Sequence, residues 1–474
     1  MSRKKNKSNA GTPNRSSQSK EKTQADVIRK SLHWVLNDKI FADFKPHGNT
    51  NWQPKFLIAL AVLTAWTNEP QLTEAFRKAK NLSEKIFGTV AMDTYQGMMR
   101  ALVTWTPYLL PILWTRLQFL MMEAGNTYYR IGMWLPLAVD GSRFSCPRTK
   151  GNEKAFAAKN FGKGRDARSR RKWKNKKKRS KKKSQPIKPQ VWLTLIWHMG
   201  LKLPWCWKTG PSNSSERHHL ADLLDKHIFP KNTLFCADAG FVGYELWQAI
   251  VGQGHSFLMR VGANVRLLRN LGHVHQGDGI VWLWPNQAAK KKQPPIVLRL
   301  IKLTGPAGDI YLVTNVLCAR RLSERRVSEL YKSRWGIELQ FRSVKQTFGR
   351  RKLKSHNPAH ALAELDWSLV ALTMVQLMAI KEQIKIEIPP EDSSVALALK
   401  AVRHAMDQWY EPATGKTSLP NLLRSAVKDD CNRESDKTAR YQPNYKDKPT
   451  ATKPKIIQST KLQKAIYREL KIAC

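Results

Sequence analysis

The chain has 474 residues, with 82 lysines and arginines against 36 aspartates and glutamates, which gives a formal net charge of +46. Its length predicts several folded domains, and its 42% hydrophobic content excludes a wholly disordered basic protein. The charge favours a polyanion as partner, because neutralising phosphates releases counterions. It argues against an ordinary enzyme of small metabolites.

An anionic membrane surface is the other polyanion to consider. The longest apolar runs, 56–66 and 368–380, are shorter than a membrane-spanning helix. The N-terminus is polar and basic, without the apolar segment of a signal peptide. The six cysteines are scattered and include no close pair typical of a zinc site. We therefore expect a cytoplasmic protein with reduced thiols and no membrane contact.

The first elements in chain order are predicted to be helical. Residues 1–24 are rich in Ser, Lys and Asn and predict a disordered basic tail. From 25 to about 130, apolar residues recur at helical spacing, and turn-rich clusters interrupt them. This pattern predicts an all-helical N-terminal domain of four to six helices. We expect it to bind DNA ends, because specific readout usually places a helix in the major groove.

Strands are predicted from residue 133 onward. A first strand is expected to end at the turn pair Asp140-Gly141, and a second, after a hairpin and a helix, at Asp238. Between the first strand and the hairpin lies a polybasic loop, 163–188. Its densest part, Lys163 to Lys183, has 14 basic residues among 21. The block is either a non-specific grip on DNA or a tolerated disordered insertion.

The remaining chain alternates again between strands and helices. Residues 255–308 predict a β-rich insertion, 322–349 one long basic helix, and 357–383 a mostly buried helix. The last stretch, 385–474, is polar and basic. The order of elements predicts an α/β core formed by 131–254 and 309–384.

Two acidic residues stand at the ends of predicted hydrophobic strands. A carboxylate at Asp140 or Asp238 would be costly beside a buried sheet unless it is solvated or binds a cation. Both residues also fit ordinary turn sequences, Asp-Gly and Asp-Ala-Gly, so each taken alone leaves a structural alternative open.

The long predicted helix carries a third acidic residue. Tyr331, Arg334, Glu338 and Lys345 follow the spacing Tyr-x2-Arg-x3-Glu-x6-Lys. On a continuous helix these four side chains fall within about 60° of one another, with Arg342 beside them. The stripe is either a functional surface or a solvated, salt-bridged helix face.

These residues resemble the signatures of a known family. The spacing of the long helix reproduces the YREK signature of the DDE transposases of bacterial insertion sequences, in the IS-four family. Asp140 in VDGSRF and Asp238 in ADAGF resemble the first two acidic motifs of that family. The resemblance covers roughly 131–384, and the long polybasic loop is a departure from it.

The resemblance implies a fold, a metal site and a partner. It implies a ribonuclease-H-like catalytic core with a β-rich insertion. It implies two Mg²⁺ ions, with Mn²⁺ as an alternative, held by Asp140, Asp238 and Glu338. Such an ion pair activates the nucleophile and stabilises the leaving oxygen of a phosphodiester. Residues expected at the DNA phosphates are Tyr331, Arg334 and Lys345, with Lys332 and Arg342 as helpers.

Some members of the family cut through a DNA hairpin and stack a flipped base on a tryptophan of the insertion. Trp282 and Trp284 are the candidates for that role here. The alternative is a strand with tryptophans in the core.

The sequence thus predicts a DNA transposase. It would bind terminal inverted repeats, cut them and join the 3′-OH ends to target DNA, as a homodimer in the synaptic complex. Its partner would be double-stranded DNA, and its location the cytoplasm, in association with the nucleoid. Two rivals remain open: an inactive or repurposed nucleic-acid-binding protein, and another ribonuclease-H-like nuclease.

Overall fold

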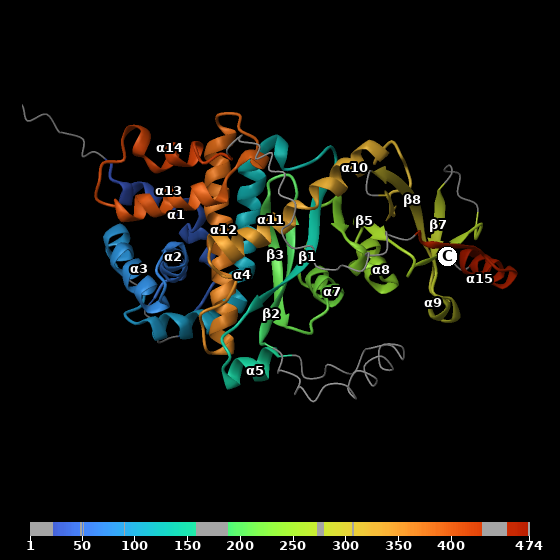
Figure 1. Ribbon diagram of the computed structural model, residues 1–474, viewed down its shortest axis with the longest axis horizontal. Helices are drawn as coiled ribbons and strands as arrows, with labels where there is room; N and C mark the ends of the chain where they lie inside the picture. The colour runs from blue at the N-terminus through green and yellow to red at the C-terminus, as the bar shows by residue number, and fades with distance from the viewer. Residues whose placement is uncertain are drawn as a thin grey trace, which may run out of the picture.

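The computed structural model describes residues 22–47, 50, 52–89, 91–157, 188–272, 279–305, 308–428 and 453–472. The predicted tail up to residue 21 and the block from Lys163 to Lys183 lie outside these residues. Within them, helices gather at one end of the molecule and one long sheet extends to the other (Figure 1).

Four helices begin the chain, as the sequence predicted. Thr23 caps the first of them in a capping box with Asp26, and the third ends at Gly88, whose φ of 71° favours glycine. They are α1 (Gln24–Val35), α2 (Pro54–Trp66), α3 (Leu72–Phe87) and α4 (Tyr95–Gly125).

Three helices from later in the chain pack onto these four. They are α12 (Pro358–Ile384), α13 (Val395–Asp407) and α14 (Leu419–Arg424). The indole of Trp66 donates to the carbonyl of Ala371 at 2.9 Å, and that of Trp367 donates to Thr106 Oγ1 at 2.8 Å. These contacts join α12 to α2 and α4 inside the core.

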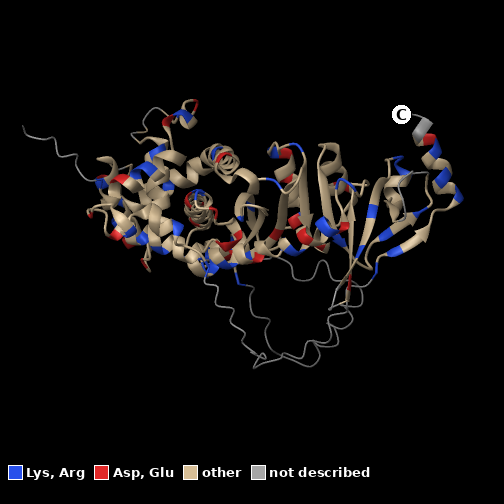
Figure 2. Ribbon diagram, turned by 90° about the horizontal axis from the view of Figure 1, so that it is seen from above, with Lys and Arg blue, Asp and Glu red and all other residues tan. Residues whose placement is uncertain are grey.

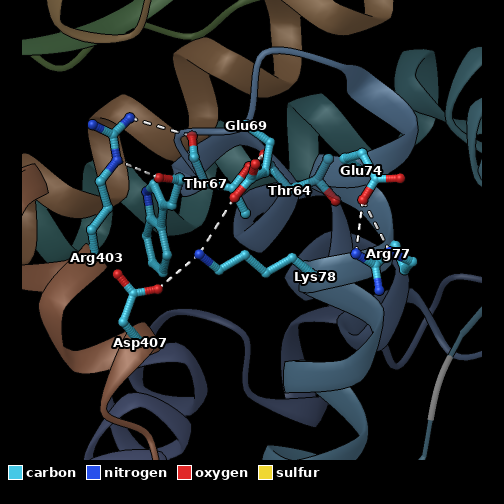
Figure 3. A network of polar contacts seen from close by, with 9 residues as sticks. Thr64, Thr67, Glu69, Glu74, Arg77, Lys78, Arg403 and Asp407 are labelled. Atoms are coloured by element: carbon cyan, nitrogen blue, oxygen red, sulfur yellow. Dashed lines mark hydrogen bonds and ion pairs between the residues drawn. The ribbon is translucent and has the colours of Figure 1, made fainter.

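Polar contacts tie α13 to the same helices (Figure 3). Arg403 donates to the carbonyls of Trp66 and Thr67, at 2.7 and 3.3 Å. Lys78 of α3 forms ion pairs with Glu69 and Asp407. The hydrogen bond to Asp407 is the main reason why the pKa of Lys78 is raised. The predicted division, with 357–384 in the catalytic core and 385–474 as a separate region, therefore needs correction. Helices from both stretches complete the helical part.

Helix α12 is both long and apolar. By length and composition it could cross a membrane, but its apolar window is entirely buried inside the protein. It is accordingly the central helix of the helical part, as its contacts with α2, α4 and α14 show.

The sheet contains ten strands in the order β10-β6-β7-β8-β9-β5-β4-β1-β2-β3. Strand β1 lies antiparallel to β2 and parallel to β4, which is parallel to β5. The first five strands are β1 (Leu135–Ser145), β2 (Gln190–His198), β3 (Leu203–Pro211), β4 (Thr233–Ala237) and β5 (Ser256–Val261). The other five are β6 (Arg266–Arg269), β7 (Ile280–Leu283), β8 (Ile296–Gly305), β9 (Gly308–Thr314) and β10 (Lys455–Gln458).

The β-rich insertion is not a separate sheet. Strand β5, which the sequence assigned to the insertion, pairs with β4, and β9 pairs with both β5 and β8. Backbone hydrogen bonds therefore run unbroken from the core strands into the insertion. Strand β10, from the far end of the chain, adds to the outer edge beside β6.

Seven further helices complete the described fold. They are α5 (Lys150–Phe156), α7 (Glu216–Lys226), α8 (Tyr244–Gly252), α9 (Asn286–Lys290), α10 (Glu324–Ser333), α11 (Gly336–Arg342) and α15 (Lys461–Ile472). Helix α7 packs beside β1 and α8 beside β5, while α15 lies at the far end of the molecule (Figure 1).

The contact between α12 and β3 includes a buried acid. Asp366 accepts a hydrogen bond from the Trp207 indole at 2.9 Å, and burial raises its pKa to about 7. The unfolded chain loses this proton near its ordinary pKa of 3.8. Stability should therefore fall as pH rises from about 4 to 7, because the folded state binds the proton more tightly.

Replacing Asp366 by asparagine keeps the oxygen acceptor and removes the charge. We expect Asp366→Asn to stabilise the protein at pH 8 by about 1–3 kcal/mol and to flatten its stability between pH 4 and 7. Denaturant unfolding at several pH values measures this. The exposed Asp225→Asn on α7 is the control. An unchanged pH profile in Asp366→Asn would contradict the assignment.

Candidate active site

The strand register places two acidic residues side by side. In the parallel pair of β1 and β4, Val139 is opposite Ala237. The next residue on each strand is an aspartate, so Asp140 and Asp238 leave the paired segment at the same end of the sheet. The sequence predicted an acid at the end of each strand, and the tertiary pairing brings the two together.

Their local structures differ. Strand β1 continues past Asp140 and pairs with β2 as far as Ser145, so the predicted turn at Asp140-Gly141 is wrong. At Asp238 the turn is present, because its carboxylate accepts from Gly240 N at 2.8 Å. Burial, and to a smaller extent the charges of Asp238 and Glu338, raise the pKa of Asp140 to about 6. The N–H of Gly141 and the charge of Arg334 act in the opposite direction.

The segment that carries the third acid is not one straight helix. Helix α10 ends at Ser333, α11 begins at Gly336, and a π-helical turn follows at Ser343–Thr347. The predicted continuous helix over 322–349 is therefore wrong. Because the breaks change the direction of side chains, the four residues of the YREK spacing do not share one straight stripe.

Glu338 lies exposed in the first turn of α11, within electrostatic range of Asp140. The helix reaches this position by a close approach at Gly336. A Cβ on Gly336 would stand 2.2 Å from Cη2 of Trp197, whose ring is buried in β2. The absence of a side chain at residue 336 thus lets α11 lie directly on the sheet near Asp140.

This approach can be tested by stability. Alanine normally favours a helix over glycine by about 1 kcal/mol. At Gly336 we expect the opposite: Gly336→Ala should destabilise the protein by about 1–3 kcal/mol, because α11 or the Trp197 ring must move. The matched control is Gly252→Ala in α8, where a Cβ would meet nothing within 4 Å. Thermal unfolding of both variants checks this, and a stabilised Gly336→Ala would contradict the packing.

Arg334 is a buried cation beside the acids. Its side chain is 5% exposed, and its guanidinium lies 5.3 Å from the Tyr331 ring and 5.4 Å from the Trp335 ring. Its Nε has no hydrogen-bond partner among the residues the structure describes. A buried charge with an unsatisfied donor is costly, so the position suits an anionic ligand. Tyr331 is also buried, and this burial raises its pKa.

The other predicted cations divide into two groups. Lys345 donates from Nζ to Ser142 Oγ at 2.7 Å, two residues beyond Asp140. Lys332 and Arg342 are exposed and line a cavity of about 700 Å³ together with Glu338, Trp335 and Lys202. Cations therefore flank Glu338 on one side and reach β1 on the other.

The two tryptophans of the insertion are not available at the surface. Trp282 and Trp284 are 3% and 4% exposed, and the Trp284 indole donates to the carbonyl of Gln293. Because both side chains are buried, neither is available to stack on a flipped base in the way the resemblance implied. Both are core residues, which is the alternative that the sequence left open.

The sequence did not single out a fourth carboxylate at this site. Glu216 begins α7, and burial, followed by the charges of Asp140 and Asp238, raises its pKa to about 7. From the sequence it was only an acid in the first turn of a helix. No spacing relates it to Asp140, so only the packing of α7 could reveal it.

The donor set has the chemistry of a divalent-cation site. Carboxylate oxygens are the ligands that Mg²⁺ prefers, and the charges of neighbouring acids contribute to the raised pKa of Asp140 and of Glu216. In the described part of the chain, however, no three His, Cys, Asp or Glu side chains converge closely enough to hold an ion in this conformation. The acids lie near one another, but their carboxylates would have to move closer together to bind one cation.

Comparison with known proteins shows the family of the chain. The model of the transposase DDE domain matches residues 135–374, which is half of the chain and contains all three predicted acids. The chain belongs to the family of DDE transposases. Among its members, the chain is similar to a transposase of the insertion sequence element IS4.

Two curated relatives were found. The chain is 30% identical over 182 residues to "Transposase InsG for insertion sequence element IS4" of Escherichia coli (strain K12), over 36% of this chain and 40% of that protein. It is 26% identical over 156 residues to "Putative transposase y4zB" of Sinorhizobium fredii (strain NBRC 101917 / NGR234), over 32% and 44%. The matches thus span less than half of either relative.

Among solved structures, the chain resembles a piggyBac transposase in a synaptic complex with hairpin DNA. The TM-score is 0.41 and the identity 11%, over 87% of each chain.

Proposed function

We propose that this protein is a cut-and-paste DNA transposase. It binds the terminal inverted repeats of its element, cuts the ends by divalent-metal-dependent hydrolysis and joins the 3′-OH ends to target DNA. The observation that carries the proposal is the parallel register of β1 and β4, which makes Asp140 and Asp238 neighbours near Glu338. Membership of the DDE transposase family supports it.

The catalytic core in this proposal is ribonuclease-H-like and consists of β1–β5 with α7, α8, α10 and α11. Asp140, Asp238 and Glu338 would hold the two cations, Mg²⁺ or Mn²⁺. Cations bound there would activate the attacking water or hydroxyl and stabilise the leaving oxygen. One of the acids lies in a strand, one directly follows a strand, and the third lies in a short helix.

Arg334 would meet a phosphate at the scissile bond. Its guanidinium is held between two rings, and its unsatisfied Nε can donate to a phosphate oxygen. Tyr331 positions that guanidinium, while Lys345 would approach the strand from the side of β1. Lys332 and Arg342 would contact the backbone further away, along the cavity beside Glu338.

Other basic surfaces fit the remaining length of DNA. Lys22, Arg29, Lys30 and Lys55 line a cavity of about 740 Å³ beside α1 and α2, which supports the helical part as the reader of the ends. Further Lys and Arg positions follow the outer strands and α15 at the opposite end (Figure 2). Pairing two ends would require a homodimer in the active complex.

The test is a cleavage assay with purified protein and DNA that carries the element's own inverted repeats. We expect nicking and end joining with Mg²⁺ or Mn²⁺, and none after chelation. Salt-dependent binding without cleavage under any metal would support a protein that only binds nucleic acid. A preference for RNA hybrids over repeat-bearing duplexes would support another nuclease instead.

A further inference from the structure

Glu216 lies between the backbone segments that follow the two aspartates. Its Oε1 is 2.5 Å from the point where a Cβ on Gly141 would stand, and Gly141 is the neighbour of Asp140. Its Oε2 is 3.4 Å from the corresponding point at Gly240, and Asp238 Oδ1 lies 2.9 Å from that same point. One carboxylate thus faces both acidic strand ends.

Two glycines make this approach possible. A methyl group on Gly141 would collide with the Glu216 carboxylate and with Cζ2 of Trp192, and a methyl group on Gly240 would press against Asp238. Any larger residue at 141 would displace Glu216 from its position. The absence of side chains at Gly141 and Gly240 therefore leaves room for the Glu216 carboxylate beside the two aspartates.

Glu216 also lacks the partner that a half-buried carboxylate needs. It has no hydrogen bond or ion pair with any residue that the structure describes, and its neighbour Ser215 makes no side-chain cap. The cation that acts on it is Arg143 of β1, whose guanidinium lies 4.6 Å from the Trp192 ring. A half-buried, unpaired carboxylate beside two other acids is costly unless a cation neutralises the group.

We propose that Glu216 is a further cation-binding residue of this site, which shares a divalent ion with Asp140 and Asp238. The inference rests on the proposed function, because it assigns the same ion a fourth carboxylate ligand beyond the three acidic motifs. Glu216 begins α7, so this ligand comes from a different helix than Glu338, which lies in α11. The site then receives carboxylates from two strands and two helices.

The experiment measures Mn²⁺ binding to the full-length protein without DNA, by calorimetry or electron paramagnetic resonance. The variants are Glu216→Gln, which keeps the shape, and Glu216→Ala, which removes the side chain. Asp238→Asn is the positive control. The matched negative control is Glu245→Gln, because Glu245 is an exposed acid in the first turn of the neighbouring helix α8.

We expect both Glu216 variants to weaken Mn²⁺ binding by at least about tenfold, as Asp238→Asn does, and Glu245→Gln to leave it unchanged. Thermal unfolding without metal should show Glu216→Gln to be as stable as the wild type or more so. If both Glu216 variants keep wild-type affinity while Asp238→Asn loses it, this inference is wrong and the proposed function stands. A wild-type protein that neither binds Mn²⁺ nor cleaves DNA would overturn both.

Discussion

Glu338→Gln is expected to lower the rate of strand cleavage by about a thousandfold or more while leaving DNA binding in place. Glutamine has nearly the same shape but lacks the charge with which Glu338 would hold a cation beside Asp140. Cation stabilisation of the reacting phosphate contributes several kcal/mol, and each 1.4 kcal/mol changes the rate about tenfold. Glu338 is exposed and unpaired in the described structure, so its replacement should not affect folding.

The measurement is single-turnover cleavage of end-bearing DNA at saturating protein. The matched control is Glu329→Gln on α10, an exposed glutamate that pairs with Arg325 and Arg326 on the helix surface. It should retain activity within about twofold, because surface ion pairs contribute little. Undiminished cleavage by Glu338→Gln would remove the residue from the site and the DDE mechanism with it.

Arg334→Lys is expected to slow cleavage by about a hundredfold even though the charge is kept. A planar guanidinium stacks between two rings and can donate to two phosphate oxygens, whereas an ammonium group acts as a point charge. Arg334 sits between Tyr331 and Trp335 and is almost fully buried. Removing one preorganised donor from a developing charge typically costs about 10²–10³ in rate.

The control for this variant is Arg325→Lys, a highly exposed arginine on α10, the helix that ends just before Arg334. Cleavage kinetics and DNA affinity should both be measured, since a purely structural role would lower the thermal stability of Arg334→Lys without a specific loss in rate. Full activity of a folded Arg334→Lys would show that the guanidinium geometry is not used.

Much of the site was predictable because its signals are local. Asp140 and Asp238 each follow a run of buried strand residues, and the alternation from buried apolar to acidic is visible in the chain itself. The Tyr331, Arg334, Glu338 and Lys345 spacing is likewise contained within one segment. The helices and strands that carry these residues were predicted for the same reason: their apolar periodicity depends only on neighbours in sequence.

The predictions that were wrong concern the continuity of one helix and the exposure of two tryptophan side chains. The segment from 322 to 349 has an uninterrupted helical pattern, yet it breaks near Arg334 and again at Ser343, where a π-helical turn packs against α12 and α13. Trp282 and Trp284 are two positions apart, a spacing that fits core residues and surface residues of a strand equally well. Only the packing of the outer strands shows that both are buried.

The sequence by itself determined the family, the three acidic motifs and the order of strands and helices, because these depend on residue types and short spacings. The tertiary structure alone decided which residues meet. Parallel pairing of β1 with β4 places Asp140 next to Asp238 across nearly a hundred residues, and Gly336 and Gly141 let α11 and Glu216 close on them. Such contacts are set by packing between elements distant in the chain, and no local pattern records them.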